Sequence, residues 1–270
     1  MKHKERLCDL MVRRGLAPNS NAAERMILAG KVKVNDEVVT QAKAQFTGAV
    51  SIEVRRSKPY VSRGGLKLEG ALKDFSFDPR GLRCLDVGAS SGGFTDCLLK
   101  AGALQVSAVD VGYGQFDWSL RQDSRVVLFE RTNIAHVDPA VLKAPFDLLV
   151  VDLSFTSLAR LAPVLAALVD ERGSILALVK PQFELPKASV KSGVVRSFDL
   201  HVQALTSVWQ AFENAGLLTQ EVSYSHIPGP KGNIEFWIWA AKQGTTATID
   251  SRIEAVVRLA HTELLGSENT

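Results

Sequence analysis

The chain has 270 residues, of which 46% are hydrophobic and 23% are charged, a balance that supports sizeable cores in about two domains. No run of 18 apolar residues occurs, so a membrane-spanning helix is excluded, and the basic start is not followed by the apolar segment of a signal peptide. The cysteines, Cys8, Cys84 and Cys97, form no CxxC pair. Neither a disulfide framework nor a zinc site is expected, and a cytoplasmic location is predicted.

Charge is distributed unevenly along the chain. Residues 1–63 hold 13 Lys and Arg against 6 Asp and Glu, a balance of +7, whereas the remaining residues hold 19 against 23, a balance of −4. A basic head on a mildly acidic body predicts that the head contacts a polyanion.

Residues 1–56 are interpreted as a small α+β domain. Short helices are expected over residues 6–12 and 22–29, where glycines follow the apolar positions as helix stops. Residues 31–39 alternate around an Asn-Asp turn and predict a hairpin, and residues 49–54 predict another strand.

The stretch VRRGLAPNSNAAERMILAGKVKVNDEVV within this domain resembles the S4-type RNA-binding module shared by a ribosomal protein and many pseudouridine synthases. The resemblance implies a basic face built from two helices and the following hairpin. Its residues here are Arg13, Arg14, Asn21, Arg25, Lys31 and Lys33. The alternative is that these charges only solvate a surface, but their number and grouping favour RNA binding.

Residues 57–61 are a short connector, in which Pro59 favours an extended backbone before it. The second predicted domain, residues 62–270, opens with a helix over residues 66–75 that carries Lys67 near its start.

From residue 82 onward, strands and helices alternate. Strands are expected over residues 82–87, 105–110, 126–129, 146–152, 174–180, 219–225 and 235–240, and helices over residues 94–101, 157–169, 199–215 and 249–265. This alternation predicts an α/β fold, a Rossmann-like, mostly parallel sheet with helices on both faces. The last two strands lack an intervening helix and should pair antiparallel. Residues 182–198 are polar and are interpreted as a long active-site loop.

A glycine turn follows the first of these strands. Asp86 ends the strand, and Gly88, Gly92 and Gly93 lead into a helix, a strand-turn-helix arrangement that binds nucleotides in such sheets. Asp110 ends the next strand about 24 residues later, where related folds hold a ribose. A plain turn is the alternative, but two acids at strand ends favour a nucleotide-like cofactor. The turn resembles the first motif of S-adenosylmethionine (SAM) methyltransferases.

Four ionisable residues stand at the ends of elements: Lys67, Asp152, Lys180 and Glu235. Asp152 and Lys180 end consecutive strands, so both should reach the carboxyl edge of the sheet, where the cofactor is expected. A charge that closes an apolar strand is costly unless it is paired or functional. A purely structural ion pair is the alternative.

The motifs SRGGLKLEGAL, DVGASSGGFTD, VDLSF, LVKPQFE and GNIEFW resemble the TlyA (hemolysin A) family of 2′-O-ribose rRNA methyltransferases, over essentially the whole chain. The catalytic part is similar to FtsJ-type enzymes and their Lys-Asp-Lys-Glu tetrad, which falls on Lys67, Asp152, Lys180 and Glu235. The resemblance implies SAM as cofactor, held by Asp86, Gly88, Ser90, Gly92, Gly93, Phe94, Asp110 and Asn133. Arg63 joins the residues expected to contact RNA. Related enzymes often carry an acid near Asn133, so this position departs from the pattern.

The predicted function is therefore SAM-dependent 2′-O-methylation of cytidine in ribosomal RNA, of the large subunit and, in members with extended termini, also of the small subunit. Lys180 is assigned as the base and Asp152 as its orienting group, while Lys67 and Glu235 place the hydroxyl. A lysine accepts a proton only when neutral, and Lys67 is expected to supply the cation that favours this form.

Two alternatives stay open: a non-catalytic rRNA-binding assembly factor and a pore-forming hemolysin. The partners expected are ribosomal RNA or ribosomal subunits, with no membrane, and the chain is expected to be a monomer. No metal site is predicted, because the five histidines show no ligand spacing.

Overall fold

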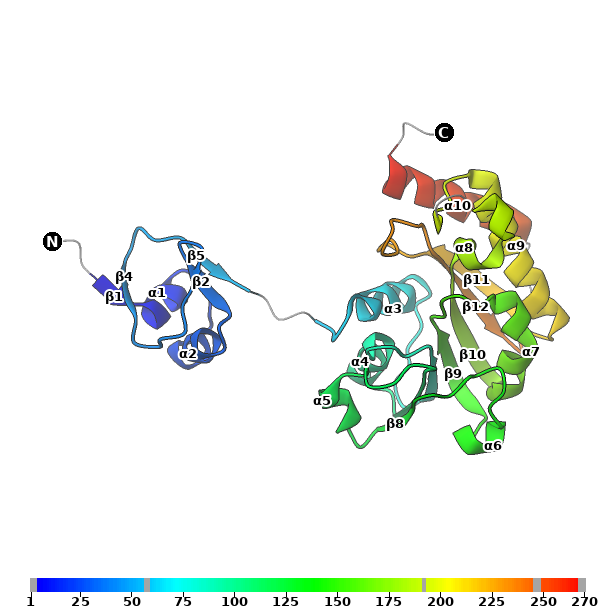
Figure 1. Cartoon of the computed structure of the whole chain (residues 1–270), viewed down its shortest axis with the longest axis horizontal. Helices are drawn as coiled ribbons and strands as arrows, with labels where there is room; N and C mark the ends of the chain where they lie inside the picture. Colours follow the sequence, from blue (N-terminus) through cyan, green and yellow to red (C-terminus); the bar gives the residue numbers. More distant parts are fainter. Residues whose placement is uncertain (1–3, 56–58, 191–192, 245–248, 267–270) are drawn as a thin grey trace. The chain divides into compact units, whose positions relative to one another are not determined.

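The computed structural model describes residues 4–55, 59–190, 193–244 and 249–266 (Figure 1). The chain divides after Lys58 into two compact units. The predicted connector, residues 57–61, lies partly outside the described residues, and its last three residues belong to the second unit.

The first unit packs two helices against small antiparallel sheets. Its elements are β1 (Lys4–Arg6), α1 (Leu7–Arg13), α2 (Ser20–Leu28), β2 (Val32–Val34), β3 (Glu37–Val38), β4 (Gln45–Thr47) and β5 (Ile52–Val54). The predicted hairpin is formed by β2 and β3. Asn35 and Asp36 take left-handed backbone angles, φ 48° and 69°, which these residue types tolerate in tight hairpin turns. The core of the unit contains Leu7, Met11, Ala23, Ile27 and Val32.

The sequence does not predict two strands of this unit, β1 and β4. They pair antiparallel with each other, apart from the sheet of β3, β2 and β5. Each has only three residues, and neither KER nor QFT shows the apolar alternation that predicts a strand. Their pairing is a tertiary contact between segments about 40 residues apart, which no local pattern reveals.

A seven-stranded sheet forms the centre of the second unit, in the order β11-β12-β10-β9-β6-β7-β8. Its strands are β6 (Arg83–Val87), β7 (Gln105–Val109), β8 (Val126–Phe129), β9 (Phe146–Val151), β10 (Val169–Val179), β11 (Leu218–Tyr224) and β12 (Phe236–Ala241). The strands from β10 to β8 pair in parallel, whereas β12 is antiparallel to both β10 and β11. The predicted parallel sheet and its antiparallel last pair are thus confirmed.

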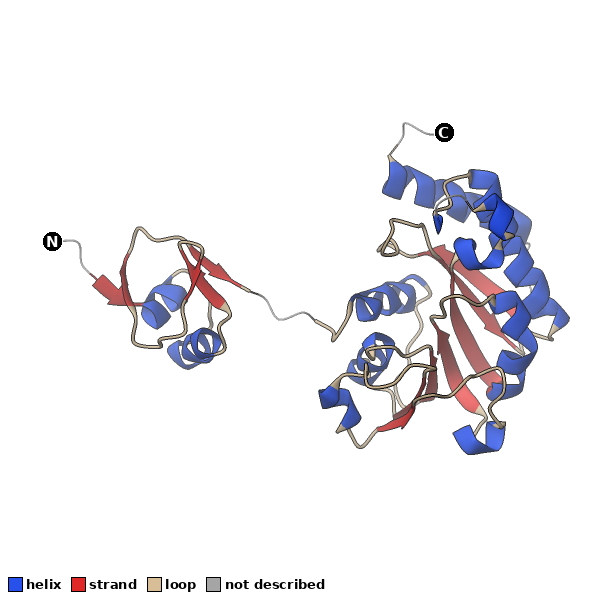
Figure 2. Cartoon of the chain, in the orientation of Figure 1, coloured by secondary structure: helices blue, strands red, loops and turns tan. Residues whose placement is uncertain are grey.

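Helices cover both faces of this sheet (Figure 2). One face carries α3 (Arg63–Asp74) and α4 (Gly93–Lys100); the other carries α7 (Leu158–Leu168), α9 (Phe198–Asn214) and α10 (Ile249–Leu265). Successive strand residues point to opposite faces, so Leu148 packs in the core under α3 and α4, and Leu149 packs in the core under α7 and α9. Strands buried on both faces are continuously apolar, which is why β9 reads FDLLVV.

Several short elements differ from the prediction. The helices α5 (Trp118–Arg121), α6 (Pro139–Leu142) and α8 (Pro181–Glu184) and the 3₁₀ turn Lys187–Ser189 are too short for a helical period to show. The loop expected over residues 182–198 therefore starts as structured chain, although residues 191–192 lie outside the described part. The strand β10 begins at Val169, five residues earlier than predicted, because the polar residues 170–172 interrupt its apolar pattern.

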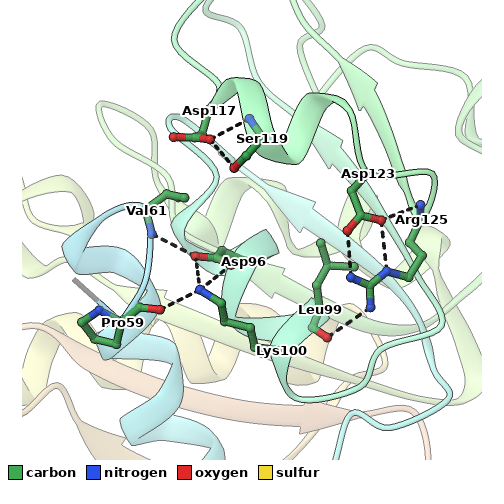
Figure 3. Close-up of polar contacts among 9 residues, drawn as sticks. All are labelled: Pro59, Val61, Asp96, Leu99, Lys100, Asp117, Ser119, Asp123 and Arg125. Carbon is green, nitrogen blue, oxygen red and sulfur yellow. Dashed lines mark hydrogen bonds and ion pairs between the residues drawn. The ribbon is translucent and has the colours of Figure 1, made fainter. Parts of the chain in front are cut away.

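The start of the second unit is fastened to α4 (Figure 3). The Asp96 carboxylate accepts a hydrogen bond from the Val61 N–H at 2.9 Å, and Lys100 Nζ donates to the Pro59 carbonyl at 2.6 Å. Lys100 also lies over the Tyr60 ring, 5.1 Å from its centroid. These contacts set where α3 begins, and α3 starts at Arg63 rather than at the predicted Leu66.

Candidate active site

The turn after β6 is built on close backbone approaches. Gly88 has φ 87°, and a Cβ there would collide with the Asp152 carbonyl oxygen, so only glycine fits. A Cβ on Gly93 would collide with Ser62 Oγ and lie 2.9 Å from the Gly65 amide nitrogen. The glycines thus bring the ends of β6 and β9 and the starts of α3 and α4 together.

Asp86 lies beneath this turn and is fully buried. Its Oδ2 accepts hydrogen bonds from the Thr95 amide at 2.9 Å and the Thr95 hydroxyl at 2.7 Å, which fixes the first turn of α4. Burial raises the pKa of Asp86 to about 7, and the bonds from Thr95 oppose that rise. Asp86 and Gly92, both predicted to bind the cofactor, line neither of the two cavities described next.

All four tetrad residues line one cavity of about 680 Å³ at the carboxyl edge of the sheet, named here the tetrad cavity. The predicted cofactor residues Gly88, Ser90, Gly93 and Phe94 line it as well. A second cavity of about 470 Å³, named the Asp110 cavity, adjoins the first. The walls that the two cavities share are formed by Gly88, Ser90, Asp152, Ser154 and Phe155.

Within the tetrad, each lysine is paired with a carboxylate. Lys67 Nζ lies 2.5 Å from Glu235 Oε2, and both side chains are buried. Lys180 forms an ion pair with Asp152, and its Nζ also donates to Ser154 Oγ at 3.1 Å.

Burial raises the pKa of Glu235, and the charges of Lys67 and Lys180 oppose that rise. The Asp152 charge adds to the rise. Glu235 therefore responds electrostatically to all three partners. With both lysines protonated and both acids ionised, the four tetrad side chains carry no net charge.

The Asp110 cavity combines a carboxylate with apolar walls. Asp110 accepts hydrogen bonds from the Ser90 amide at 2.7 Å and the Gly112 amide at 2.6 Å, so the carboxylate is fixed at the end of β7. Asn133 also lines the cavity, and its Oδ1 accepts a hydrogen bond from the Ala135 amide at 3.0 Å. Apolar lining comes from Val111, Ile134, Ala135, Leu153 and Leu161.

A carboxylate suits ribose hydroxyls, an amide suits the edge of a base, and apolar walls suit its faces. The Asp110 cavity therefore fits an adenosine group.

The predicted RNA-binding residues of the first unit differ in their surroundings. Arg14 donates to the carbonyls of Gly48 and Val50 at 2.6 and 2.8 Å, so it holds the fold of the unit. Arg13 pairs with Glu5 at 2.8 Å. Asn21, Arg25 and Lys33 are exposed, and Lys31 is half-buried.

Arg63 belongs to the second unit. It lines the tetrad cavity and donates to the Pro228 carbonyl at 3.2 Å. Its predicted contact with RNA would therefore be made at the reaction site rather than by the N-terminal module.

Sequence reasoning missed Phe155. This side chain is 91% exposed at the mouth of both cavities, its φ is 65°, and its ring lies 5.2 Å from that of Phe183. An aromatic residue three positions after the strand-end acid, in VDLSF, was the available signal. Lys231 also lines the tetrad cavity without having been predicted, and so does Gln182, which begins the segment predicted as an active-site loop.

Neither a metal nor a membrane is suggested by the described residues. Among residues 4–55, 59–190, 193–244 and 249–266, no group of three or more His, Cys, Asp or Glu could hold a metal ion. No helix in that part of the chain is long and apolar enough to cross a bilayer.

Comparison with known proteins assigns both units. The family model for FtsJ-like methyltransferases matches residues 60–242, and the S4 domain model matches residues 5–48. The chain is 40% identical to the 16S/23S rRNA (cytidine-2′-O)-methyltransferase TlyA of Mycobacterium tuberculosis, over 97% of this chain and 99% of the relative.

Solved structures agree with this assignment. A candidate hemolysin from Streptococcus thermophilus is 34% identical, with a TM-score of 0.75 and full coverage of both chains. A candidate SAM-dependent methyltransferase from Listeria monocytogenes, 14% identical with a TM-score of 0.50 over 67% of this chain and 98% of its own, shares the fold. The chain therefore belongs to the TlyA family, and it consists of an S4 domain followed by an FtsJ-like methyltransferase domain.

Proposed function

We propose that this protein transfers a methyl group from SAM to the 2′-hydroxyl of a cytidine in ribosomal RNA. The observation that carries the proposal is the arrangement of Lys67, Asp152, Lys180 and Glu235 around one cavity, which adjoins a second cavity suited to adenosine. The M. tuberculosis relative is named for this reaction on 16S and 23S rRNA, which suggests the same class of substrate here.

The Asp110 cavity is the proposed site of the adenosine half of SAM. Asp110 and Asn133 both line this cavity, where Asp110 would accept hydrogen bonds from the ribose and Asn133 would bond to the base. Gly88 lines both cavities, so the backbone there can approach the centre of the ligand without a Cβ intervening. Bound SAM would supply an electrophilic methyl group on a sulfonium. The methionine part would lie toward the tetrad cavity, beside Ser90 and Gly93.

Lys180 is the proposed base. A ribose hydroxyl is a weak nucleophile until it begins to lose its proton. The proposed acceptor of that proton is Lys180 Nζ in its neutral amine form, which becomes an ammonium as the oxygen bonds to the methyl group. Asp152 holds Nζ in place beforehand and stabilises the ammonium that results. Ser154 adds a second fixed contact to Nζ, which limits the directions from which the hydroxyl can approach.

Lys67 and Glu235 form the proposed positioning half of the tetrad. Glu235 fixes the ammonium of Lys67 from within the sheet, so Lys67 can donate to the oxygens of the target ribose. In-line methyl transfer depends strongly on the position of the attacking oxygen, and correct placement alone can account for ~7–11 kcal/mol of a barrier. The near-neutral charge of the tetrad also avoids burying a large uncompensated charge.

Three basic residues of the first unit, the exposed Arg25 and Lys33 and the half-buried Lys31, are proposed to bind RNA phosphates together with Arg13. Arg63 and Lys231 would add positive charge at the rim of the tetrad cavity, where the target nucleotide enters. In this proposal the first unit supplies most of the affinity for RNA, and the second unit carries out the methyl transfer.

Methyl transfer can be measured directly with purified protein, SAM labelled on the methyl group, and ribosomal subunits. The expected result is label in rRNA that resists alkaline hydrolysis at one linkage, because a 2′-O-methyl group removes the hydroxyl that cleaves the chain. Nucleoside analysis should assign the label to cytidine. Label on a base, or no label on either subunit, would refute the proposed reaction.

A further inference from the structure

The two strands that carry Asp152 and Lys180 stop pairing with each other before those residues. The last registered pair between β9 and β10 is Val151 with Ala177. Beyond it, Asp152 continues into the turn before α7, and Lys180 continues into α8. The Asp152 amide still bonds to the Val87 carbonyl of β6, and Val179 still pairs with Phe236 of β12, but no hydrogen-bonded pair of β9 and β10 sets the separation of Asp152 and Lys180 directly.

We propose that Glu184 is a positioning residue for methyl transfer, which holds the segment after Asp152 against the segment after Lys180. The inference rests on the proposed function, because it concerns the geometry of the same reaction. Glu184 lies four residues after Lys180, at the end of α8, and its carboxylate reaches the start of α7.

The contacts of Glu184 are those of a helix cap supplied by another element. Its Oε2 accepts a hydrogen bond from Ser157 Oγ at 2.7 Å, and its Oε1 accepts one from the Leu158 amide at 2.8 Å. The Ala159 amide lies 3.5 Å from Oε2. Ser157 occupies the N-cap position of α7, but its own side chain makes no capping bond to the helix. The carboxylate thus meets the unpaired N–H groups and the positive end of α7.

A second contact joins the same two segments. The Phe183 ring stacks against the Phe155 ring at 5.2 Å between centroids, one residue before Glu184 and two residues before Ser157. Phe155 keeps a left-handed φ of 65°, which needs support from its surroundings in a residue with a bulky side chain. The Glu184 cap and this ring contact supply that support close to the Lys180–Asp152 ion pair.

Glu184 is not a surface charge that water could replace. Burial raises its pKa, and the bonds from Ser157, Leu158 and Ala159 oppose that rise. Removing the carboxylate would leave the start of α7 unsatisfied and would release the turn that carries Asp152. Displacements of about 1 Å in such a site can lower a reaction rate by ~100-fold.

The test compares Glu184→Ala and Glu184→Gln in the full-length protein. Glu184→Ala should lower the single-turnover rate of methyl transfer by ~10- to 100-fold at saturating rRNA substrate and SAM. Affinity for SAM, measured by calorimetry, should fall by less than the rate. Residues 152–156 line part of the Asp110 cavity, but Asp110 and Asn133 are held by backbone amides that do not involve Glu184. Glu184→Gln should recover most of the rate, since its amide can still accept from Leu158 and donate to Ser157 Oγ.

Asp147→Ala is the matched control. Asp147 lies near the start of β9, and Asp152 follows the other end of that strand. The Asp147 carboxylate accepts a hydrogen bond from the Arg83 amide at 2.7 Å. The variant also removes a part-buried carboxylate that joins two elements. It should lower the melting temperature but leave the single-turnover rate unchanged at temperatures well below melting.

A Glu184→Ala rate equal to wild type, or an equal loss in Asp147→Ala, overturns the proposal. If Glu184→Ala does not fold, Ser157→Ala can be tested instead, because it removes the hydrogen bond between Ser157 Oγ and Glu184. This variant should also have a lower rate of methyl transfer. An unchanged rate in Ser157→Ala would contradict the proposal. A crystal structure of the variant that folds gives a readout independent of turnover. Residues 152–157 should shift away from Lys180, and an unmoved turn contradicts the inference even where the wild-type protein transfers no methyl group to rRNA.

Discussion

At the scale of single residues, the tetrad works as two ion pairs that share one cavity. Lys67 is tied to Glu235 and Lys180 to Asp152, although the four residues come from four distant parts of the chain. Sequence spacing could suggest that these residues meet, because strand ends of a parallel sheet share an edge. The sequence analysis assigned Asp152 to orient Lys180, and the two residues do form an ion pair. The direct pairing of Lys67 with Glu235 could not be predicted, since it depends on the positions of α3 and β12.

Lys180→Ala is the sharpest residue-scale prediction. Loss of the proposed base should lower the rate of methyl transfer by ~100- to 10,000-fold, the usual range for a general base. Affinity for SAM and the melting temperature should stay near wild type. Lys180→Arg should fail as well, because a guanidinium does not give up its proton near neutral pH. A Lys180→Ala enzyme that turns over at a comparable rate would show that another group takes the proton.

Asp86 predicts a pH dependence of stability. Its pKa is raised by burial to about 7 in the folded state, from 3.8 as the ordinary value. The folded state therefore binds the proton more tightly, so this contribution to stability is fully present below pH 4 and is lost as pH rises through about 7. Asp86→Asn keeps an acceptor for Thr95 and carries no charge.

The free energy of unfolding of wild type, relative to that of Asp86→Asn, should fall as the pH rises from 5 to 8. The fall should be about 1.4 kcal/mol for each pH unit below about 7, where the folded state holds the proton and the unfolded state does not, and it should level off above that pH. Denaturant titrations at both pH values provide the measurement. A difference that stays constant with pH would mean that Asp86 is ionised throughout.

At the scale of elements, sequence reasoning placed the start of α3 three residues too late. The glycines at 64 and 65 suggested a helix that starts at Leu66, but α3 begins at Arg63 and includes both. These glycines allow neighbouring side chains to pack closely against α3. A Cβ on Gly65 would collide with the Tyr60 side chain, which lies where the chain enters the second unit. The strands β6, β7 and β9 were predicted well, because buried parallel strands are continuously apolar.

Two glycines of α3 give a matched pair of variants. Gly65→Ala should destabilise the protein by ~1–3 kcal/mol through overpacking against Tyr60 and should lower activity by moving Lys67. Gly70→Ala adds the same methyl group to the same helix, where the nearest atom is His226 Cδ2 at 3.4 Å. The higher helix propensity of alanine should make it neutral or stabilising by up to ~1 kcal/mol. Thermal unfolding of both variants tests the difference, and equal effects would contradict the packing account.

At the scale of the whole molecule, charge separates the tasks of the two units. The first unit, residues 1–58, holds 12 Lys and Arg against 6 Asp and Glu, a balance of +6, and the second unit holds 20 against 23, a balance of −3. The cofactor and tetrad residues all lie in the second unit. A truncated chain that begins at Pro59 keeps the contacts to Asp96 and Lys100. It should fold and bind SAM, and it should lose most of its affinity for rRNA.

Salt dependence measures the same division. The logarithm of the association constant between the full chain and rRNA should fall by ~0.7–0.9 per phosphate contact for each tenfold increase in salt concentration. Replacing Arg25, Lys31 and Lys33 by alanine should lower that slope by about two to three. These residues are preferable to Arg14, whose bonds to Gly48 and Val50 hold the first unit together. If filter binding shows an unchanged slope and affinity in the variant, the first unit does not grip the RNA.

The central claim is that this protein methylates the ribose of a cytidine in rRNA, and mapping of 2′-O-methyl groups on rRNA tests it most directly. Ribosomal RNA from cells that contain the protein should carry a 2′-O-methylcytidine that is missing from cells without it. Wild-type protein should restore this modification, and Lys180→Ala should not. Identical ribose methylation maps with and without the protein would contradict the account.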